Sequence, residues 1–160
     1  TAADSSVVKS LVGTLTAWDP IARQPRWKVE HADVWNGGVL ATAGNLVFQG
    51  TNRGELHAYR ADDGKRVWSA EAQTGVHAAP MSYAVGGRQF IAVSAGSGTA
   101  LGVAGGHLAS FSLAPNRSRV LAFSLDGGAT LPPPATTPAA AAPAAGITLN
   151  IDAQLAAAGK

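Results

Sequence analysis

The sequences GTLTAW at residues 13–18 and GELHAY at residues 54–59 decide the fold, because they are two copies of one pattern. Each has Gly, then Leu two residues later, then Ala followed by an aromatic residue, and the copies lie 41 residues apart. The same spacing relates Trp27 to Trp68. A period of about 40–45 residues is typical of the four-stranded blades of a β-propeller. One such sheet cannot bury both of its faces alone, so a Trp in each repeat is expected to pack against the next copy.

Short apolar runs separated by turn signals indicate antiparallel strands on both sides of these copies. The turn signals, which favour positive φ, are Asn36-Gly37-Gly38, Gly44-Asn45 and Asp62-Asp63-Gly64. No amphipathic helix is predicted between residues 7 and 125. The expected strands lie at residues 13–18, 39–42, 46–49, 55–59, 66–68, 90–94 and 119–125. We therefore predict an all-β chain that forms a partial β-propeller of about two blades, since a closed ring needs at least about four.

The composition changes near the C-terminus. Residues 1–126 are the predicted blades, residues 127–146 form a linker rich in Ala and Pro, and residues 147–160 resume a weak helical pattern. Such a linker has little to bury, so we expect a disordered Ala/Pro-rich tail that leads toward a further element. The chain does not begin with Met and has no signal peptide, which favours a fragment of a longer protein.

The overall composition excludes several classes of function. With 46% hydrophobic and 14% charged residues, the chain is apolar enough for a packed domain. Its net charge is +2 without a basic run, so we expect no nucleic-acid partner. The absence of Cys excludes a disulfide, a thiolate metal site and a CxxCH haem motif within these residues. No stretch approaches the length of a membrane span.

The histidines do not form a metal-binding pattern. None of them has a partner at i,i+2 or i,i+4, so we expect no metal ligands in this chain. His57 aligns with Thr16 in the other copy, which predicts a surface position. Asp62-Asp63-Gly64 lacks the alternating oxygen ligands and distal Glu of a calcium loop, and a hairpin turn explains it better.

The Trp35-Asn36 pair has a structural interpretation from the residues alone, and a second, functional one that comes with the resemblance described below. From the residues alone, it is a core Trp followed by an Asn-Gly turn, because buried Trp is common and Asn-Gly is a strong turn signal. Trp27 and Trp68 are expected to be packing residues.

Longer strings carry a resemblance to a known family. GTLTAWDP at residues 13–20, VWNGG at residues 34–38 and LATAGNLVFQGT at residues 40–51 resemble segments of PQQ-dependent (quinoprotein) alcohol dehydrogenases, and the resemblance covers roughly residues 11–134. That family's tryptophan-docking pattern is A-x-D-x-x-x-G-x-x-x-W. In the first copy Arg23 stands at the Gly position, and in the second copy Arg60 stands at the Asp position.

The resemblance implies an eight-bladed propeller that holds PQQ beside a calcium ion, with the calcium ligands and the catalytic base outside this chain. It places Trp35 and Asn36 near PQQ. It also aligns a Gly-Trp-Gly-Gly loop near the cofactor with residues 96–99, where Ser97 replaces the Trp. The candidate cofactor-binding residues are thus Trp35, Asn36 and Ser97, with no catalytic residue in the chain.

The implied function is a fragment of a periplasmic enzyme that oxidises primary alcohols to aldehydes and passes electrons to cytochrome c. Its partners would be the remaining blades of the propeller and a haem c domain, which residues 147–160 would begin. One alternative is a non-catalytic module for binding or assembly built from similar repeats. Another is a degraded gene fragment, whose open sheet edges would promote aggregation. The resemblance implies that the residues that contact the alcohol come mainly from blades outside this chain.

Overall fold

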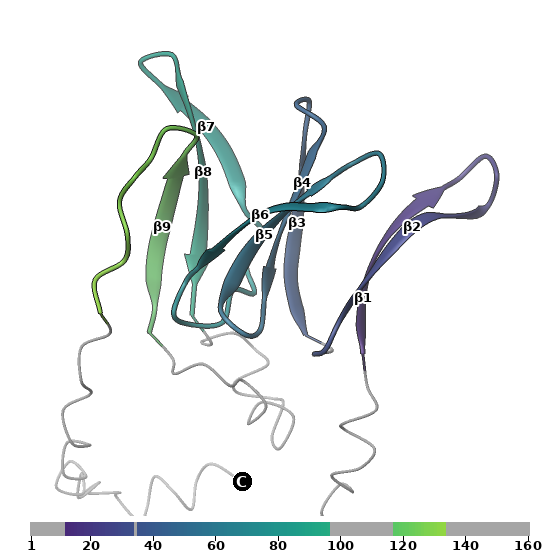
Figure 1. The fold of residues 1–160 in the computed structure, drawn as a ribbon, viewed down its shortest axis with the longest axis horizontal. Helices are drawn as coiled ribbons and strands as arrows, with labels where there is room; N and C mark the ends of the chain where they lie inside the picture. Colours follow the sequence, from purple (N-terminus) through teal and green to yellow (C-terminus); the bar gives the residue numbers. More distant parts are fainter. Residues whose placement is uncertain (1–11, 34, 97–116, 134–160) are drawn as a thin grey trace, which may run out of the picture.

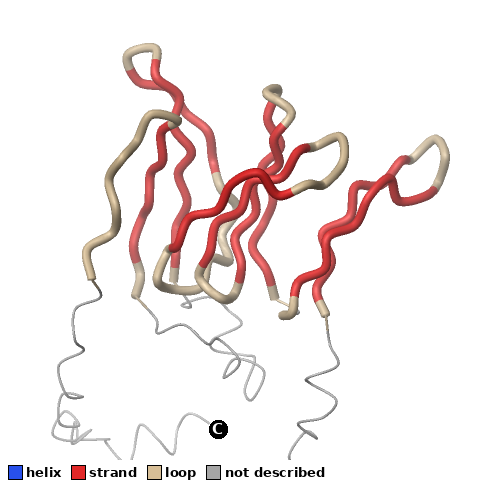
Figure 2. The backbone as a smooth tube through the Cα atoms, in the orientation of Figure 1, coloured by secondary structure: helices blue, strands red, loops and turns tan. Residues whose placement is uncertain are grey.

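The computed structural model describes residues 12–33, 35–96 and 117–133. Within those residues the chain forms nine antiparallel β-strands and no helix, as Figures 1 and 2 show. The strands are β1 (Gly13–Asp19), β2 (Gln24–His31), β3 (Asn36–Thr42), β4 (Leu46–Thr51), β5 (Glu55–Arg60), β6 (Arg66–Glu71), β7 (Met81–Val85), β8 (Arg88–Ala95) and β9 (Arg119–Ser124). They form three sheets with the orders β1-β2, β3-β4-β5-β6 and β7-β8-β9.

The sheets stand side by side, with the four-stranded sheet between the other two (Figure 1). In the middle sheet each strand pairs with its neighbour in sequence, which is the arrangement of a complete propeller blade. The two-stranded and three-stranded sheets are parts of the blades on either side. The prediction of an all-β partial propeller is confirmed, with one whole blade and parts of two others.

The sequence repeat is also a structural repeat. Ala17 pairs with Trp27 across β1 and β2, and Ala58 pairs with Trp68 across β5 and β6. The ladder is irregular directly after the Ala in both pairs, between Ala17 and Trp18 and between Ala58 and Tyr59. The β1-β2 pair therefore corresponds to the outer half of the middle sheet, down to the position of its bulge.

Two hydrophobic clusters join the sheets. The first, between β1-β2 and the middle sheet, contains buried Leu15, Val47 and Tyr59. The second, between the middle sheet and β7-β8-β9, includes Leu56 and Val93, which are almost fully buried. Because β4 and β5 are buried along most of their length, the middle sheet packs on both faces. Each fully buried large apolar side chain contributes about 1.5–3 kcal/mol, so the interfaces between sheets provide the stability that a single sheet lacks.

The two repeat tryptophans both contact the following sheet, which confirms that they are packing residues. The indole N–H of Trp27 in β2 donates a hydrogen bond to the carbonyl oxygen of Ala61, at 2.9 Å. Trp68 in β6 stands edge-on to Phe123 in β9, with 5.3 Å between the ring centroids. Trp27 thus makes a hydrogen bond and Trp68 an aromatic contact, although the strands that carry the two tryptophans are equivalent.

Three sequence predictions need correction. Asn36-Gly37-Gly38 is not a turn: it begins β3, with an irregular register between Asn36 and Val39. The strands β2 and β7 were not predicted, because QPRWKVEH is mostly polar and MSYAV is exposed along its whole length. His57 does not lie on the surface: only 4% of it is exposed, because β1-β2 covers its side of β5.

Candidate functional site

The loops that join the sheets gather at one end of the strands, together with the end of β8 and the beginning of β9 (Figure 1). The segment 72–80 between β6 and β7 is fixed there by backbone hydrogen bonds to its neighbours. Ala72 N–H donates to the Gly54 carbonyl at 2.7 Å, and Gly96 N–H donates to the Gly75 carbonyl at 2.8 Å. These bonds tie the middle sheet to the β7-β8-β9 sheet, so this end, called here the loop end, is a fixed scaffold.

Glycines allow the close approach of segment 72–80. A Cβ added to Gly37 would stand 2.7 Å from the carbonyl oxygen of Val76, and one added to Gly50 would overlap the Val76 side chain. At Gly54, which has a φ of +89°, an added Cβ would meet the Thr74 carbonyl oxygen at 2.9 Å. The Gly37-Gly38 pair therefore serves close packing within a strand, where the sequence had suggested a turn.

Trp35 and Asn36 lie at the loop end, immediately before and at the start of β3. Trp35 is 42% exposed, so it is not the core Trp that one interpretation of the sequence proposed. The Asn36 side chain donates through Nδ2 to the backbone carbonyl oxygen of Asp33, at 2.8 Å. Its Oδ1 is buried and has no hydrogen-bond partner in the part of the chain that the structure describes. An unsatisfied buried acceptor costs about 1–3 kcal/mol, so a hydrogen-bond donor from outside the described residues would stabilise this atom.

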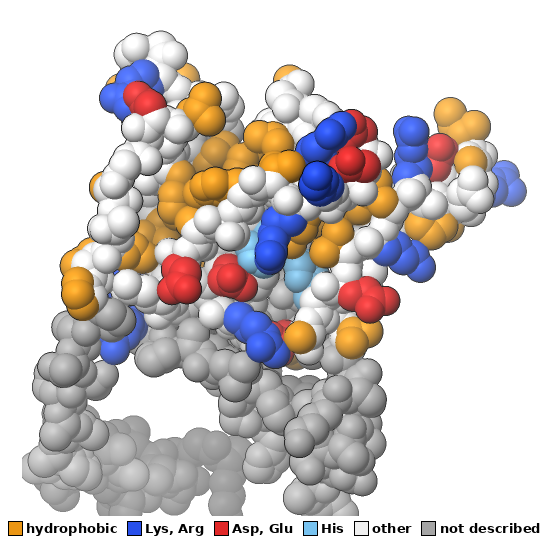
Figure 3. All heavy atoms as spheres, in the orientation of Figure 1, with side chains coloured by type: hydrophobic (Ala, Val, Ile, Leu, Met, Phe, Trp, Pro, Cys, Tyr) orange, Lys and Arg blue, Asp and Glu red, His pale blue; other side chains and the backbone are white. Residues whose placement is uncertain are grey.

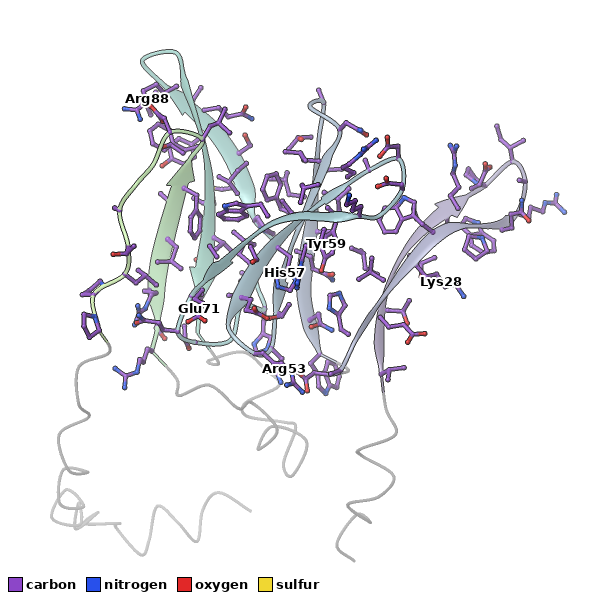
Figure 4. All side chains as sticks on the ribbon, viewed as in Figure 1. Lys28, Arg53, His57, Tyr59, Glu71 and Arg88 are labelled. Atoms are coloured by element: carbon purple, nitrogen blue, oxygen red, sulfur yellow. The ribbon has the colours of Figure 1, made fainter. Side chains whose placement is uncertain are left out.

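An ion pair holds the loop that precedes Trp35. The Arg53 guanidinium donates from Nε to Asp33 Oδ2 at 2.8 Å and from Nη2 to Asp33 Oδ1 at 3.5 Å. Figure 4 shows Arg53 at the loop end, far from Arg88 at the opposite end of the sheets. Sequence reasoning missed both Asp33 and Arg53, because a single Asp and a single Arg that lie 20 residues apart give no pattern.

A hollow of about 520 Å³ opens beside the loop end, lined by His77 and Ala78 and by the adjoining ends of β8 and β9. Arg119 lines it and donates from Nη1 to Gln73 Oε1 at 3.1 Å. Gly96 also lines it, directly before Ser97. Ser97 itself lies outside the described residues, and only the preceding residue, Gly96, is seen to line the hollow.

His77 is a further polar residue of this end that sequence reasoning did not single out. Its Nε2 lies 2.9 Å from Asn52 Oδ1, so this nitrogen carries the proton and donates. Its Nδ1 is buried without a partner in the described residues. Burial lowers the pKa of His77, which keeps the ring neutral.

A buried polar cluster lies between the β1-β2 pair and the middle sheet, where Figure 3 shows histidine atoms recessed in the face. His57 Nδ1 lies 2.8 Å from the Tyr59 hydroxyl, and Figure 4 shows the two side chains together. His57 Nε2 is 3.4 Å from Glu55 Oε2, an ion-pair distance without hydrogen-bond geometry. Burial lowers the pKa of His57, and the nearby Glu55 carboxylate opposes that shift.

The same cluster also contacts Gly37, the residue that follows Asn36. His31 Nε2 lies 3.0 Å from Gln49 Oε1, and Gln49 donates from Nε2 to the Gly37 carbonyl oxygen at 3.0 Å. His31 and Gln49 are both buried. The residue after Asn36 is therefore fixed by buried polar contacts, just as the loop before Asn36 is fixed by the Asp33–Arg53 ion pair.

Two general features complete the description of these residues. Among residues 12–33, 35–96 and 117–133, no group of three or more His, Asp and Glu side chains is placed to hold a metal ion. The described residues contain no helix that is long and apolar enough to cross a membrane.

The fold agrees with what comparison with known proteins shows. Residues 4–91 match the PQQ family of β-propeller domains, described as the glucose/ethanol/alcohol dehydrogenase β-propeller domain. The chain belongs to this family.

Individual relatives of known name are similar to this chain in sequence. The chain is 50% identical over 139 residues to quinohemoprotein alcohol dehydrogenase ADH IIB of Pseudomonas putida, which covers 86% of this chain and 20% of that protein. It is 46% identical over 123 residues to 1-butanol dehydrogenase (cytochrome c) of Thauera butanivorans, covering 75% of this chain and 17% of that protein. The chain thus spans about a fifth of the length of the curated relatives it matches.

A solved structure supports the same assignment. The structure of quinohemoprotein alcohol dehydrogenase ADHIIG from Pseudomonas putida superposes with a TM-score of 0.76 at 41% identity, covering 84% of this chain and 20% of that one. The arrangement of one whole blade between two partial blades therefore matches a segment of the propeller in that structure.

Proposed function

We propose that this chain supplies one side of the cofactor site of a PQQ-dependent alcohol dehydrogenase, an oxidoreductase that converts primary alcohols to aldehydes. The observation that carries the proposal is the pair at the start of β3: a half-exposed Trp35 indole beside the buried, donor-less Asn36 Oδ1. The names of the relatives, which are alcohol dehydrogenases, support the activity.

The residues of the loop end fit a flat aromatic cofactor. Trp35 can offer its exposed ring to a planar ligand, and Asn36 can accept a hydrogen bond from it. Ser97 follows Gly96 in a Gly-rich loop, and its backbone is proposed to face a carboxylate of the ligand. PQQ, when bound, supplies a two-electron quinone that accepts a hydride from the alcohol. The role of this chain is to bind PQQ and to orient it. The catalytic base and the calcium ligands are proposed to come from other blades.

The wider assignment extends these roles to the complete protein. In this proposal residues 1–126 belong to the blades, residues 127–146 to a linker and residues 147–160 to the start of a further element. Residues 1–11, 34, 97–116 and 134–160 lie outside the described residues. We propose that a haem c domain follows, that cytochrome c accepts the electrons, and that the enzyme works in the periplasm with calcium beside PQQ. The name of the Thauera relative includes cytochrome c, which supports cytochrome c as the electron acceptor.

The test uses a complete polypeptide in which residues 12–133 occupy the matching segment of the Pseudomonas putida ADH IIB relative, called here the hybrid enzyme. Alcohol-dependent reduction of cytochrome c is measured after loading with PQQ and Ca²⁺. Trp35→Ala is expected to raise the Kd for PQQ roughly tenfold, since aromatic contacts contribute on the order of 1 kcal/mol beyond their buried area. Trp18→Ala is the matched control, because Trp18 is 58% exposed at the other end of β1.

The outcome separates this function from a non-catalytic module. A scaffold built from similar repeats would not bind PQQ saturably, and neither Trp35→Ala nor Trp18→Ala would change its PQQ binding. If Trp35→Ala and Trp18→Ala changed PQQ binding equally, the loop end would not be the cofactor side of the chain.

A further inference from the structure

The amide of Asn36 has only one possible orientation. Its partner at 2.8 Å is the backbone carbonyl oxygen of Asp33, which can accept a hydrogen bond but cannot donate one. The amide nitrogen must therefore face Asp33, and the amide oxygen must be the free end. That oxygen is buried and lacks a partner among the described residues. The loop end thus presents an acceptor at this point, and a complementary ligand group must be a donor.

The position of the Asp33 carbonyl depends on Arg53. Asp33 lies in the loop between β2 and β3, and its side chain is 17% exposed. Arg53 lies in the turn between β4 and β5 and contacts both carboxylate oxygens of Asp33. A planar guanidinium that contacts both oxygens fixes direction as well as distance, which a single point charge does not. The ion pair therefore ties a loop to a turn whose own position is set by backbone hydrogen bonds.

The first residue of β1 shows how closely this corner is packed. A Cβ added to Gly13 would stand 2.6 Å from Asn36 Nδ2 and would overlap the Asp33 carbonyl oxygen. The Asn36–Asp33 hydrogen bond therefore has no room to shift toward β1. Movement of the Asp33 loop is opposed by β1 on one side and by Arg53 on the other.

We propose that Arg53 is a positioning residue for the cofactor site: through Asp33 it fixes the Asn36 amide with its oxygen as the group offered to the ligand. The proposal rests on the proposed function, since it assigns Asn36 to the PQQ site. It adds that the group of the cofactor facing Asn36 is an N–H or O–H donor. It also adds that an arginine without contact to the cofactor determines affinity for it.

The test is a double-mutant cycle in the hybrid enzyme, with the Kd for PQQ measured by equilibrium titration in excess Ca²⁺. Arg53→Ala is expected to raise the Kd about threefold to tenfold, and Asn36→Ala at least as much. In the Asn36→Ala background, Arg53→Ala is expected to have no further effect, because its target is gone. Arg53→Lys should recover only part of the affinity, since it restores charge without the planar fork.

The matched control is Arg60→Ala. Arg60 is 46% exposed in its side chain, close to the 49% of Arg53, and it also pairs with an aspartate, but at the opposite end of β5. Arg60→Ala should leave the Kd for PQQ unchanged. Thermal unfolding of every variant separates affinity from folding, and the Tm of Arg53→Ala should match that of Arg60→Ala.

The possible results distinguish the two proposals. If Asn36→Ala leaves the Kd unchanged, the assignment of Asn36 to the cofactor site fails, and with it the proposed site. If Asn36→Ala weakens binding but Arg53→Ala does not, the site stands and the positioning role is wrong. Additive effects of Arg53→Ala and Asn36→Ala would also overturn the positioning role, because they would show that Arg53 acts independently of the amide.

Discussion

The ring of Trp27 lies directly against the backbone of Gly64, so that a Cβ added to Gly64 would stand 2.7 Å from ring atoms. Trp27 belongs to the β1-β2 sheet and Gly64 to the turn after β5, so the contact joins one blade to the next. Gly64 has a φ of +72°, which side chains rarely adopt. One residue therefore meets two demands, the shape of its own turn and the docking of a neighbouring blade.

Gly64→Ala is expected to reduce the free energy of unfolding of the hybrid enzyme by about 2–5 kcal/mol. The left-handed backbone costs about 1–2 kcal/mol for an L-residue, and displacement of the Trp27 ring adds about 1–3 kcal/mol. Gly86→Ala is the control, because Gly86 also has a positive φ, of 58°, but has no atom within 4 Å of the added Cβ. Denaturant unfolding should show the larger loss at Gly64, and equal losses would mean that the Trp27 contact contributes nothing.

Arg23→Gly is expected to stabilise the protein by about 0.5–1 kcal/mol. Arg23 occupies in the first copy the position that Gly64 occupies in the second, and it has a φ of 54°. Its turn is formed instead by Asp19, whose Oδ1 accepts hydrogen bonds from the backbone of Ile21 and Ala22, both at 2.9 Å. Glycine removes the cost of the left-handed conformation, partly offset by its greater freedom in the unfolded chain. A decrease in stability on urea unfolding would show that the Arg23 side chain has a role of its own.

The sequence predicted the repeat well, because Gly, Leu, Ala and Trp repeat at one spacing and each has a fixed packing role. It did not predict the buried cluster of His31, Gln49 and His57, since polar residues become core residues only when another sheet covers them. The burial of His57 is a tertiary effect: in β1 the equivalent position, Thr16, is exposed, because no described sheet covers that face. Asp33 and Arg53 were missed for the same reason, as their proximity follows from the fold and not from spacing.

Acidification is expected to destabilise the protein through His57 and His77. Burial lowers the pKa of both below the ordinary value of 6.5, so both rings are neutral in the folded state. Below about pH 6.5 the unfolded chain binds more protons than the folded chain, so stability falls from there until the folded-state pKa is passed. Thermal unfolding at pH 7.5 and 5.5 measures the loss.

The variant that checks this assignment is His57→Gln, which cannot take up a proton. It is expected to show a smaller decrease in Tm between pH 7.5 and 5.5 than the parent, and His57→Gln with His77→Gln a smaller decrease still. An unchanged pH dependence in the double variant would mean that other groups cause the acid sensitivity.

The most direct test of the cofactor assignment is equilibrium titration of the PQQ-free hybrid enzyme with PQQ in excess Ca²⁺, followed by addition of a primary alcohol. Saturable binding of one PQQ per polypeptide is expected, with an absorbance change on alcohol addition that shows reduction of the quinone. Asn36→Ala is expected to raise the Kd in the same titration. Absence of saturable binding, or binding that is indifferent to Trp35 and Asn36 alike, would contradict the claim that this chain forms one side of the PQQ site.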